Sequence, residues 1–211
     1  MNTAVLVLEN GQVFTGRSFG AVGQTLGEAV FCTAMTGYQE TLTDPSYHRQ
    51  IVVATAAQIG NTGWNSEDGE SRVDGATDSS GKVWVSGFVI RDSSRRASNW
   101  RSERTLESEL AEQNIVGISG VDTRAIVRRL RDRGSMKAGI FSGEALTGND
   151  TEALLEKVRG QESMAGANLS AEVSVSEVEV TPATAERIGN LAVLDLGVKQ
   201  STIDNLAARG F

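Results

Sequence analysis

Short apolar runs alternate with polar turns along the first two thirds of the chain, a pattern that predicts strands. Residues 4–8 and 13–19 flank Asn10-Gly11, the pair that most strongly favours a two-residue hairpin. The run at 82–90 carries apolar side chains on both faces, so we expect it in the middle of a sheet. Further predicted strands lie at residues 29–35, 51–57, 115–118 and 136–141.

Helical periodicity follows the strand at 82–90. In the segment 123–133 the side chains of Ile126, Val127 and Leu130 fall on one face, and Gly134 is placed to end the helix. Between residues 91 and 160 three helices are expected, at 102–112, 123–133 and 149–160, with Ser102, Asp122 and Asn149 as their N-caps.

Residues 161–190 are polar and show little periodicity, which predicts a linker. An apolar run at 191–196 then leads through Gly197 into an amphipathic helix at 199–209. This is the opening βα unit of a parallel sheet, and a parallel strand needs a neighbour reached by a crossover. We therefore expect a first domain at 1–160 and a second, incomplete domain at 191–211, in a fragment of a longer protein.

Polar chemistry gathers between the strands at 29–35 and 51–57, where a loop carries Ser46 and His48. Pro45 fixes its own φ and favours a turn at this point. Loops held by rigid strands are common places for ligand contacts. The alternative is a polar crossover that only satisfies its own backbone.

Composition narrows the possible partners. The chain has 211 residues and a net charge of −7, which argues against binding to nucleic acid or anionic membrane. No apolar run approaches the ~20 residues of a membrane span. The first residues lack a basic region before an apolar core, and one cysteine excludes an internal disulfide. We expect a cytoplasmic protein. One histidine and one cysteine cannot build a tetrahedral metal site.

Several motifs in order along the chain resemble the small, glutamine-handling subunit of carbamoyl-phosphate synthetase. They are Met35-Thr36-Gly37-Tyr38-Gln39-Glu40, Leu42-Thr43-Asp44-Pro45-Ser46-Tyr47, Gln58-Ile59-Gly60-Asn61-Thr62-Gly63 and Gly120-Val121-Asp122-Thr123-Arg124. The resemblance extends over essentially the whole chain. It implies an α/β fold: a layered β/β/α domain of the swivelling type, followed by the first βα unit of a class I glutamine amidotransferase domain.

The resemblance also implies a function. The complete subunit hydrolyses glutamine and delivers ammonia to a large subunit, which makes carbamoyl phosphate from bicarbonate and ATP with magnesium, for arginine and pyrimidine biosynthesis. Ser46 is the residue of this part that the resemblance places in the glutamine pocket. The family's catalytic triad lies beyond residue 211, so no catalytic residue, cofactor or metal is expected in these residues.

Two alternatives remain open. A stand-alone hydrolase would need Cys32 and His48 as a catalytic pair, although a cysteine within an apolar strand is usually inert. A non-enzymatic adaptor would need only a docking surface. The basic segment 91–101, with Trp100, and the arginine row of the helix 123–133 are candidates for contact with an acidic partner. Each could equally be a solvated surface.

Overall fold

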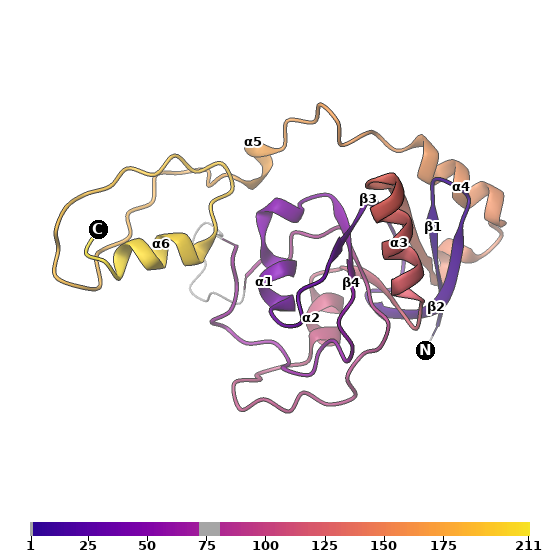
Figure 1. Ribbon diagram of the computed structural model, residues 1–211, viewed down its shortest axis with the longest axis horizontal. Helices are drawn as coiled ribbons and strands as arrows, with labels where there is room; N and C mark the ends of the chain where they lie inside the picture. The colour runs from indigo at the N-terminus through magenta and orange to yellow at the C-terminus, as the bar shows by residue number, and fades with distance from the viewer. Residues whose placement is uncertain (1, 72–80) are drawn as a thin grey trace.

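The computed structural model describes residues 2–71 and 81–211, and its main feature is a closed sheet (Figure 1). The strands are β1 Thr3–Leu8, β2 Val13–Gly20, β3 Gln24–Cys32, β4 Gln50–Ala54, β5 Gly87–Val89, β6 Val116–Ser119 and β7 Met136–Ser142. They form a barrel in the order β1-β2-β6-β5-β4-β3-β7. Neighbours from β3 through β4 and β5 to β6 are parallel, and the remaining pairs are antiparallel. The fold is therefore mixed α/β.

Helices connect and cover these strands. They are α1 Tyr38–Thr43, α2 Leu106–Glu112, α3 Thr123–Arg133, α4 Thr151–Gly160, α5 Ser170–Val173 and α6 Gln200–Ala207, with 3-10 turns η1 Pro45–Tyr47 and η2 Gly143–Leu146. In Figure 1, α3 lies across the barrel, α4 covers β1, and the chain beyond α4 crosses to α6 on the side of α1. The expected layered arrangement of the swivelling type stays a prediction.

Alternation along the strands separates two buried faces. Ile51 and Val53 of β4 join one apolar cluster, while Val52 and Ala54 join another. The first cluster gathers the inward residues of β1, β4, β6 and β7 and receives Ile126 and Leu130 from α3. The second lies under α1 and α2, and a third lies between α4 and the strands β1 and β7. The helices α1, α2, α3 and α4 therefore each cover an apolar part of the sheet.

Several predictions are confirmed. The hairpin joins β1 to β2 around Asn10-Gly11. The Asp122 carboxylate caps α3 by accepting a hydrogen bond from the Ala125 backbone N–H at 3.0 Å, and Gly134 ends that helix with a φ of 86°. The isolated Trp64 predicts packing against its own domain, and its side chain is completely buried in the second apolar cluster.

Three predicted strands have different bounds. β3 begins at Gln24 and ends at Cys32, because residues 24–29 pair with β7; Met35, predicted to lie in this strand, is 88% exposed. β4 ends at Ala54 rather than at residue 57. The strand predicted at 82–90 shortens to Gly87–Val89, the three residues that pair with both β4 and β6.

The loop predicted after Met35 contains the helix α1, which the sequence analysis missed. Gly37 precedes this helix with a φ of 78°, and Gln39 is buried against Asn65. The low hydrophobicity of residues 66–80 predicts an exposed loop. Residues 72–80 lie outside the described part, and of the rest Gly69 and Ser71 are buried.

Two predicted N-caps are wrong. Thr105 rather than Ser102 caps α2, because its Oγ1 accepts from the Ser108 backbone N–H at 3.1 Å. Asp150 rather than Asn149 caps α4, accepting from the backbone N–H of Ala153 at 2.9 Å. In both cases the actual cap lies within three residues of the predicted one and has the same chemistry.

The strand predicted at 191–196 does not form among the described residues. Leu194 is 82% exposed and Leu196 61% exposed, and the segment has no ladder partner within the described ranges. The helix predicted at 199–209 is present as α6. Residues 161–190 are largely irregular apart from α5, and their role as a linker stays a prediction.

We expect Gly117→Ala to lower the free energy of unfolding by about 1–3 kcal/mol through overpacking. A Cβ at position 117 would stand 2.7 Å from the Phe19 carbonyl oxygen and 3.0 Å from the Phe88 carbonyl oxygen, both on neighbouring strands. Gly160→Ala is the control, because nothing lies within 4 Å of its added Cβ and alanine favours a helix. Urea unfolding of both variants measures the difference. Equal stabilities would contradict the close strand contact.

Candidate functional site

The loop that joins α1 to β4 presents Ser46 at the surface. Asp44 caps the turn η1, and its Oδ1 accepts from the Ser46 backbone N–H at 2.9 Å. Pro45 is buried, whereas Ser46 is exposed. No hydrogen bond to the Ser46 hydroxyl is seen from residues 2–71 or 81–211. The loop therefore holds the backbone of Ser46 and leaves its hydroxyl available for a ligand.

Asp44 also binds the C-terminal part of the chain. Its side chain is only 8% exposed, and its Oδ2 lies 2.5 Å from the Lys199 Nζ. The hydrogen bond to Asp44 raises the pKa of Lys199 above its ordinary value, so Lys199 remains charged. Both oxygens of one buried carboxylate are thus engaged, one within the loop and one with the residue that precedes α6.

A second ion pair lies at the far end of the same loop. Glu172 in α5 accepts from Arg49 Nη2 at 2.7 Å and lies 2.8 Å from His48 Nε2. The bond to His48, followed by the charge of Arg49, lowers the pKa of Glu172 below its ordinary 4.5. Arg49 has a left-handed φ of 61°, which is uncommon for a residue with a side chain and fixes the entry into β4. His48 therefore serves as a hydrogen-bonding residue of this loop.

Glu70 forms the third contact with the C-terminal part. Its carbonyl oxygen accepts from the Gln200 backbone N–H at 2.9 Å, and its carboxylate accepts from the Ser201 N–H at 3.1 Å. Both donors belong to the first turn of α6, where a negative charge is favourable. The backbone N–H of Glu70 in turn donates to Thr43 Oγ1 at 2.8 Å, which ties this contact to the residue before Asp44.

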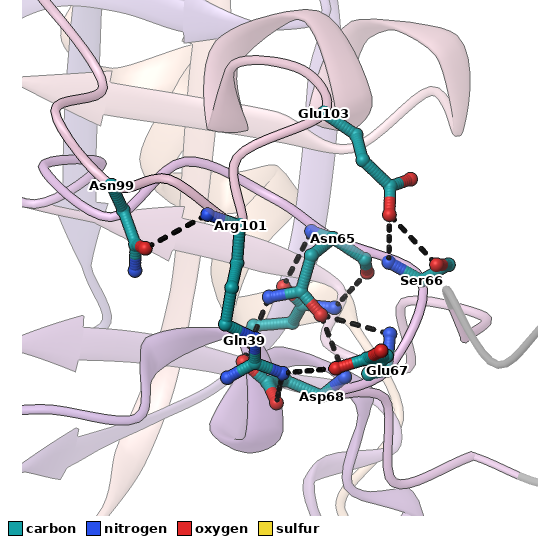
Figure 2. Close-up of polar contacts among 8 residues, drawn as sticks. All are labelled: Gln39, Asn65, Ser66, Glu67, Asp68, Asn99, Arg101 and Glu103. Atoms are coloured by element: carbon teal, nitrogen blue, oxygen red, sulfur yellow. Dashed lines mark hydrogen bonds and ion pairs between the residues drawn. The ribbon is translucent and has the colours of Figure 1, made fainter.

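A buried amide pair holds the segment before Glu70 against the start of α1 (Figure 2). Gln39 donates through Nε2 to the Asn65 carbonyl at 2.7 Å and accepts from the Asn65 N–H at 3.1 Å. The Asn65 side chain then accepts from the backbone N–H groups of Glu67 and Asp68. Residues 65–70 therefore lie along α1, fastened at Gln39 and at Thr43.

Arg101 fastens the same segment from its other side. Its Nη2 lies 2.6 Å from Asp68 Oδ1 and 2.8 Å from Glu67 Oε2, and these contacts raise its pKa further (Figure 2). Its backbone N–H donates to Asn99 Oδ1 at 3.0 Å. Arg101, predicted as part of a docking surface, is instead directed into its own domain.

The proposed pairing of Cys32 with His48 finds no support. Cys32 ends β3, is half-buried, and has Thr41 Oγ1 at 3.9 Å from its sulfur. His48 is bound to Glu172, and no hydrogen bond joins it to Cys32 in the part of the chain that the structure describes. Within the same ranges, no group of three or more histidine, cysteine or carboxylate residues could hold a metal ion, and no helix is long and apolar enough to cross a membrane.

Comparison with known proteins bears on this site. Residues 6–140 match the family model described as the carbamoyl-phosphate synthase small chain, CPSase domain. The chain belongs to this family. The match to the CPSase domain extends from β1 into β7 and includes Ser46, whereas Glu172 and Lys199 lie beyond it. The domain boundaries expected at residues 160 and 190 stay predictions.

Relatives named carbamoyl phosphate synthase small chain are similar along the whole chain. The protein from Corynebacterium diphtheriae is 61% identical over 207 residues, which are 98% of this chain and 52% of the relative. That from Mycobacterium tuberculosis H37Rv is 60% identical over 214 residues, 100% of this chain and 54% of the relative. The protein from Streptomyces coelicolor is 57% identical over 207 residues, which are 98% of this chain and 52% of the relative. The chain spans about half the length of the curated relatives it matches.

We expect the contact between Glu172 and the Ser46 loop to depend on pH. A carboxylate whose pKa is lowered in the folded state stabilises that state above its unfolded pKa, and the stabilisation is lost as pH falls through the folded pKa. Protection factors for amide exchange in α5 should therefore fall as pH drops below the ordinary value of 4.5. Glu172→Gln should show low protection already at pH 7. The control is Glu177→Gln, which is exposed. A wild-type protection factor that is constant down to pH 3 would contradict the pair.

Proposed function

We propose that this chain is the N-terminal part of the glutamine-handling small chain of a carbamoyl-phosphate synthase. The complete chain would hydrolyse glutamine and deliver ammonia to a large chain, which makes carbamoyl phosphate from bicarbonate and ATP. ATP and magnesium would bind to that large chain, and the complex would be cytoplasmic. Relatives of the same name at about 60% identity support the proposal. The structural observation that carries it is the exposed, uncommitted hydroxyl of Ser46 at the contact with residues 195–201.

The C-terminal residues fit the start of a second domain. We infer that residues 191–211 begin the amidotransferase domain, that residues 161–190 are the linker, and that residues 1–160 form the layered β/β/α domain. Leu194 and Leu196 are exposed, as expected for apolar residues of a parallel strand whose neighbouring strands come from the rest of that domain. A start of a second domain at this point would explain why the apolar residues 191–196 form no strand pairing with the described residues.

Ser46 has suitable chemistry for an amino acid ligand. A hydroxyl can donate to the carboxylate of glutamine or accept from its ammonium group. A hydrogen bond to a charged group is worth about 1.5–3 kcal/mol. The nucleophile would come from outside these residues, since no cysteine–histidine pair occurs in the described ranges. The role of Ser46 is therefore to hold the substrate.

Ser46→Ala in the complete small chain, assembled with its large chain, should raise the KM for glutamine about tenfold or more, because a charge-assisted hydrogen bond is lost. Carbamoyl phosphate synthesis from added ammonia should be unchanged, since it bypasses the glutamine site. Ser163→Ala, at another exposed serine, is the control. An unchanged KM for glutamine would remove Ser46 from the site.

The loop between β5 and α2 supports a contact with the large chain. Trp100 is 93% exposed, and Arg95 and Arg96 are exposed without an ion pair among the described residues. Exposed tryptophan and arginine are the residues most enriched at binding hot spots. The backbone beneath them is ordered by hydrogen bonds, including Ser98 N–H to the Asn61 carbonyl at 2.9 Å. A rigid surface of this kind loses little entropy on binding.

We expect Arg95→Glu/Arg96→Glu to weaken the association with the large chain by about tenfold or more, through charge reversal at an interface. Arg124→Glu/Arg128→Glu, on the exposed face of α3, makes the same charge change on the other basic surface and should have little effect. Arg101 is left intact because it supports residues 65–68. Titration by fluorescence anisotropy measures both affinities. If only the α3 variant lost affinity for the large chain, the contact would lie on α3 instead of on the loop between β5 and α2.

A further inference from the structure

We propose that Asp44 is a positioning residue that couples the placement of Ser46 to the docking of residues 195–201. The same carboxylate accepts from the Ser46 backbone N–H at 2.9 Å and from the Lys199 ammonium at 2.5 Å. A movement of Lys199 therefore acts directly on the acceptor that fixes Ser46. The inference rests on the proposed function, because Ser46 is the substrate contact proposed above.

Because the Asp44 carboxylate is buried, a change at Lys199 can affect the position of the Ser46 backbone. Asp44 is 5% exposed and lies between Thr43, which is fully buried, and Pro45, whose φ is fixed by its ring. A buried carboxylate is costly unless each oxygen has a partner. Because one oxygen is satisfied by the loop and the other by Lys199, undocking of Lys199 leaves a buried charge that the loop must rearrange to solvate.

The opposite side of the contact is also a defined turn. Asp195 Oδ1 accepts from the backbone N–H groups of Gly197 at 2.7 Å and Val198 at 2.8 Å. Gly197 has a φ of 95°, and a Cβ added to it would lie 3.4 Å from Pro45 Cβ. The two carboxylate-capped turns therefore lie close together, and the Lys199 ammonium, which follows the second turn, binds the carboxylate that caps the first.

Two neighbouring contacts hold the same surfaces together but make no bond to Ser46 or to the Asp44 carboxylate, although one of them binds His48, the residue that ends the turn. Glu172 binds His48 and Arg49 after it, and Glu70 binds the first turn of α6. These contacts keep residues 195–201 close to the loop. Asp44 adds the one bond, among the described residues, that joins the Ser46 backbone and the C-terminal part through a single side chain.

Two substitutions separate this coupling from a local effect on the turn. Asp44→Asn keeps an amide oxygen that can accept from the Ser46 N–H, but it removes the charge that binds Lys199. Asp44→Ala removes both interactions. If Asp44 only shapes the turn, Asp44→Asn behaves as wild type and Asp44→Ala does not. If Asp44 couples the two parts, Asp44→Asn already has most of the effect.

The test uses the complete small chain assembled with its large chain. We expect Asp44→Asn to raise the KM for glutamine about tenfold, with a smaller change in kcat and no change in ammonia-dependent synthesis, because a misplaced substrate contact weakens binding. Amide exchange in residues 195–201 should be faster. Asp150→Asn, another carboxylate cap with one backbone partner, is the matched control and should change neither measurement.

A double-mutant cycle with Lys199→Met completes the experiment. The two single variants and the double variant should all speed amide exchange in residues 195–201 to the same extent. All three break the same ion pair, between Asp44 and Lys199. Wild-type KM and exchange in Asp44→Asn would overturn the proposal, as would additive effects on exchange. A wild-type complex that uses ammonia but not glutamine would instead overturn the proposed function, while the exchange cycle would still decide whether the coupling exists.

Discussion

Closure of the sheet is the constraint on which the other features depend. β7 pairs antiparallel with both β1 and β3, and this joins the hairpin at one end of the chain to the parallel run β3-β4-β5-β6. A closed sheet has no free edge, and its inner face must be filled by side chains. Ile126 and Leu130 of α3 help to fill it, so that the helix and the barrel stabilise each other.

Three carboxylates act as acceptors where distant segments of the chain meet. Glu70, Asp44 and Glu172 each receive donors from a segment distant in sequence. Glu40, in α1 between them, responds to this environment: burial, and then the charges of Asp68 and Glu70, raise its pKa above the ordinary value.

The sequence was most informative where local chemistry decides the structure. The Asn10-Gly11 turn and the Asp122 cap depend on neighbouring residues only, and both were predicted correctly. α1 was missed because its stability comes from tertiary contacts: Gln39 pairs with Asn65, and the Tyr38 hydroxyl donates to the Gly63 carbonyl at 2.5 Å. The strand expected at 191–196 failed for the same reason, because a parallel strand exists only with its neighbours.

In the candidate site, too, local features were predictable from the sequence and tertiary contacts were not. Ser46 was identified by resemblance, and the turn around it by Pro45. The partners of its loop were not predictable, because Glu172 lies 124 residues from His48 and a lone acid in a polar linker gives no signal of such a contact. Lys199 was predicted only as the start of a helix.

The parallel direction of β4 and β5 places two surfaces at opposite ends of the barrel. The Ser46 loop enters β4, whereas the segment with Trp100 follows β5, so one surface lies where these strands begin and the other where they end. Molecules engaged at the two surfaces would not compete for space. The closed barrel between the two surfaces therefore fixes the distance that separates them.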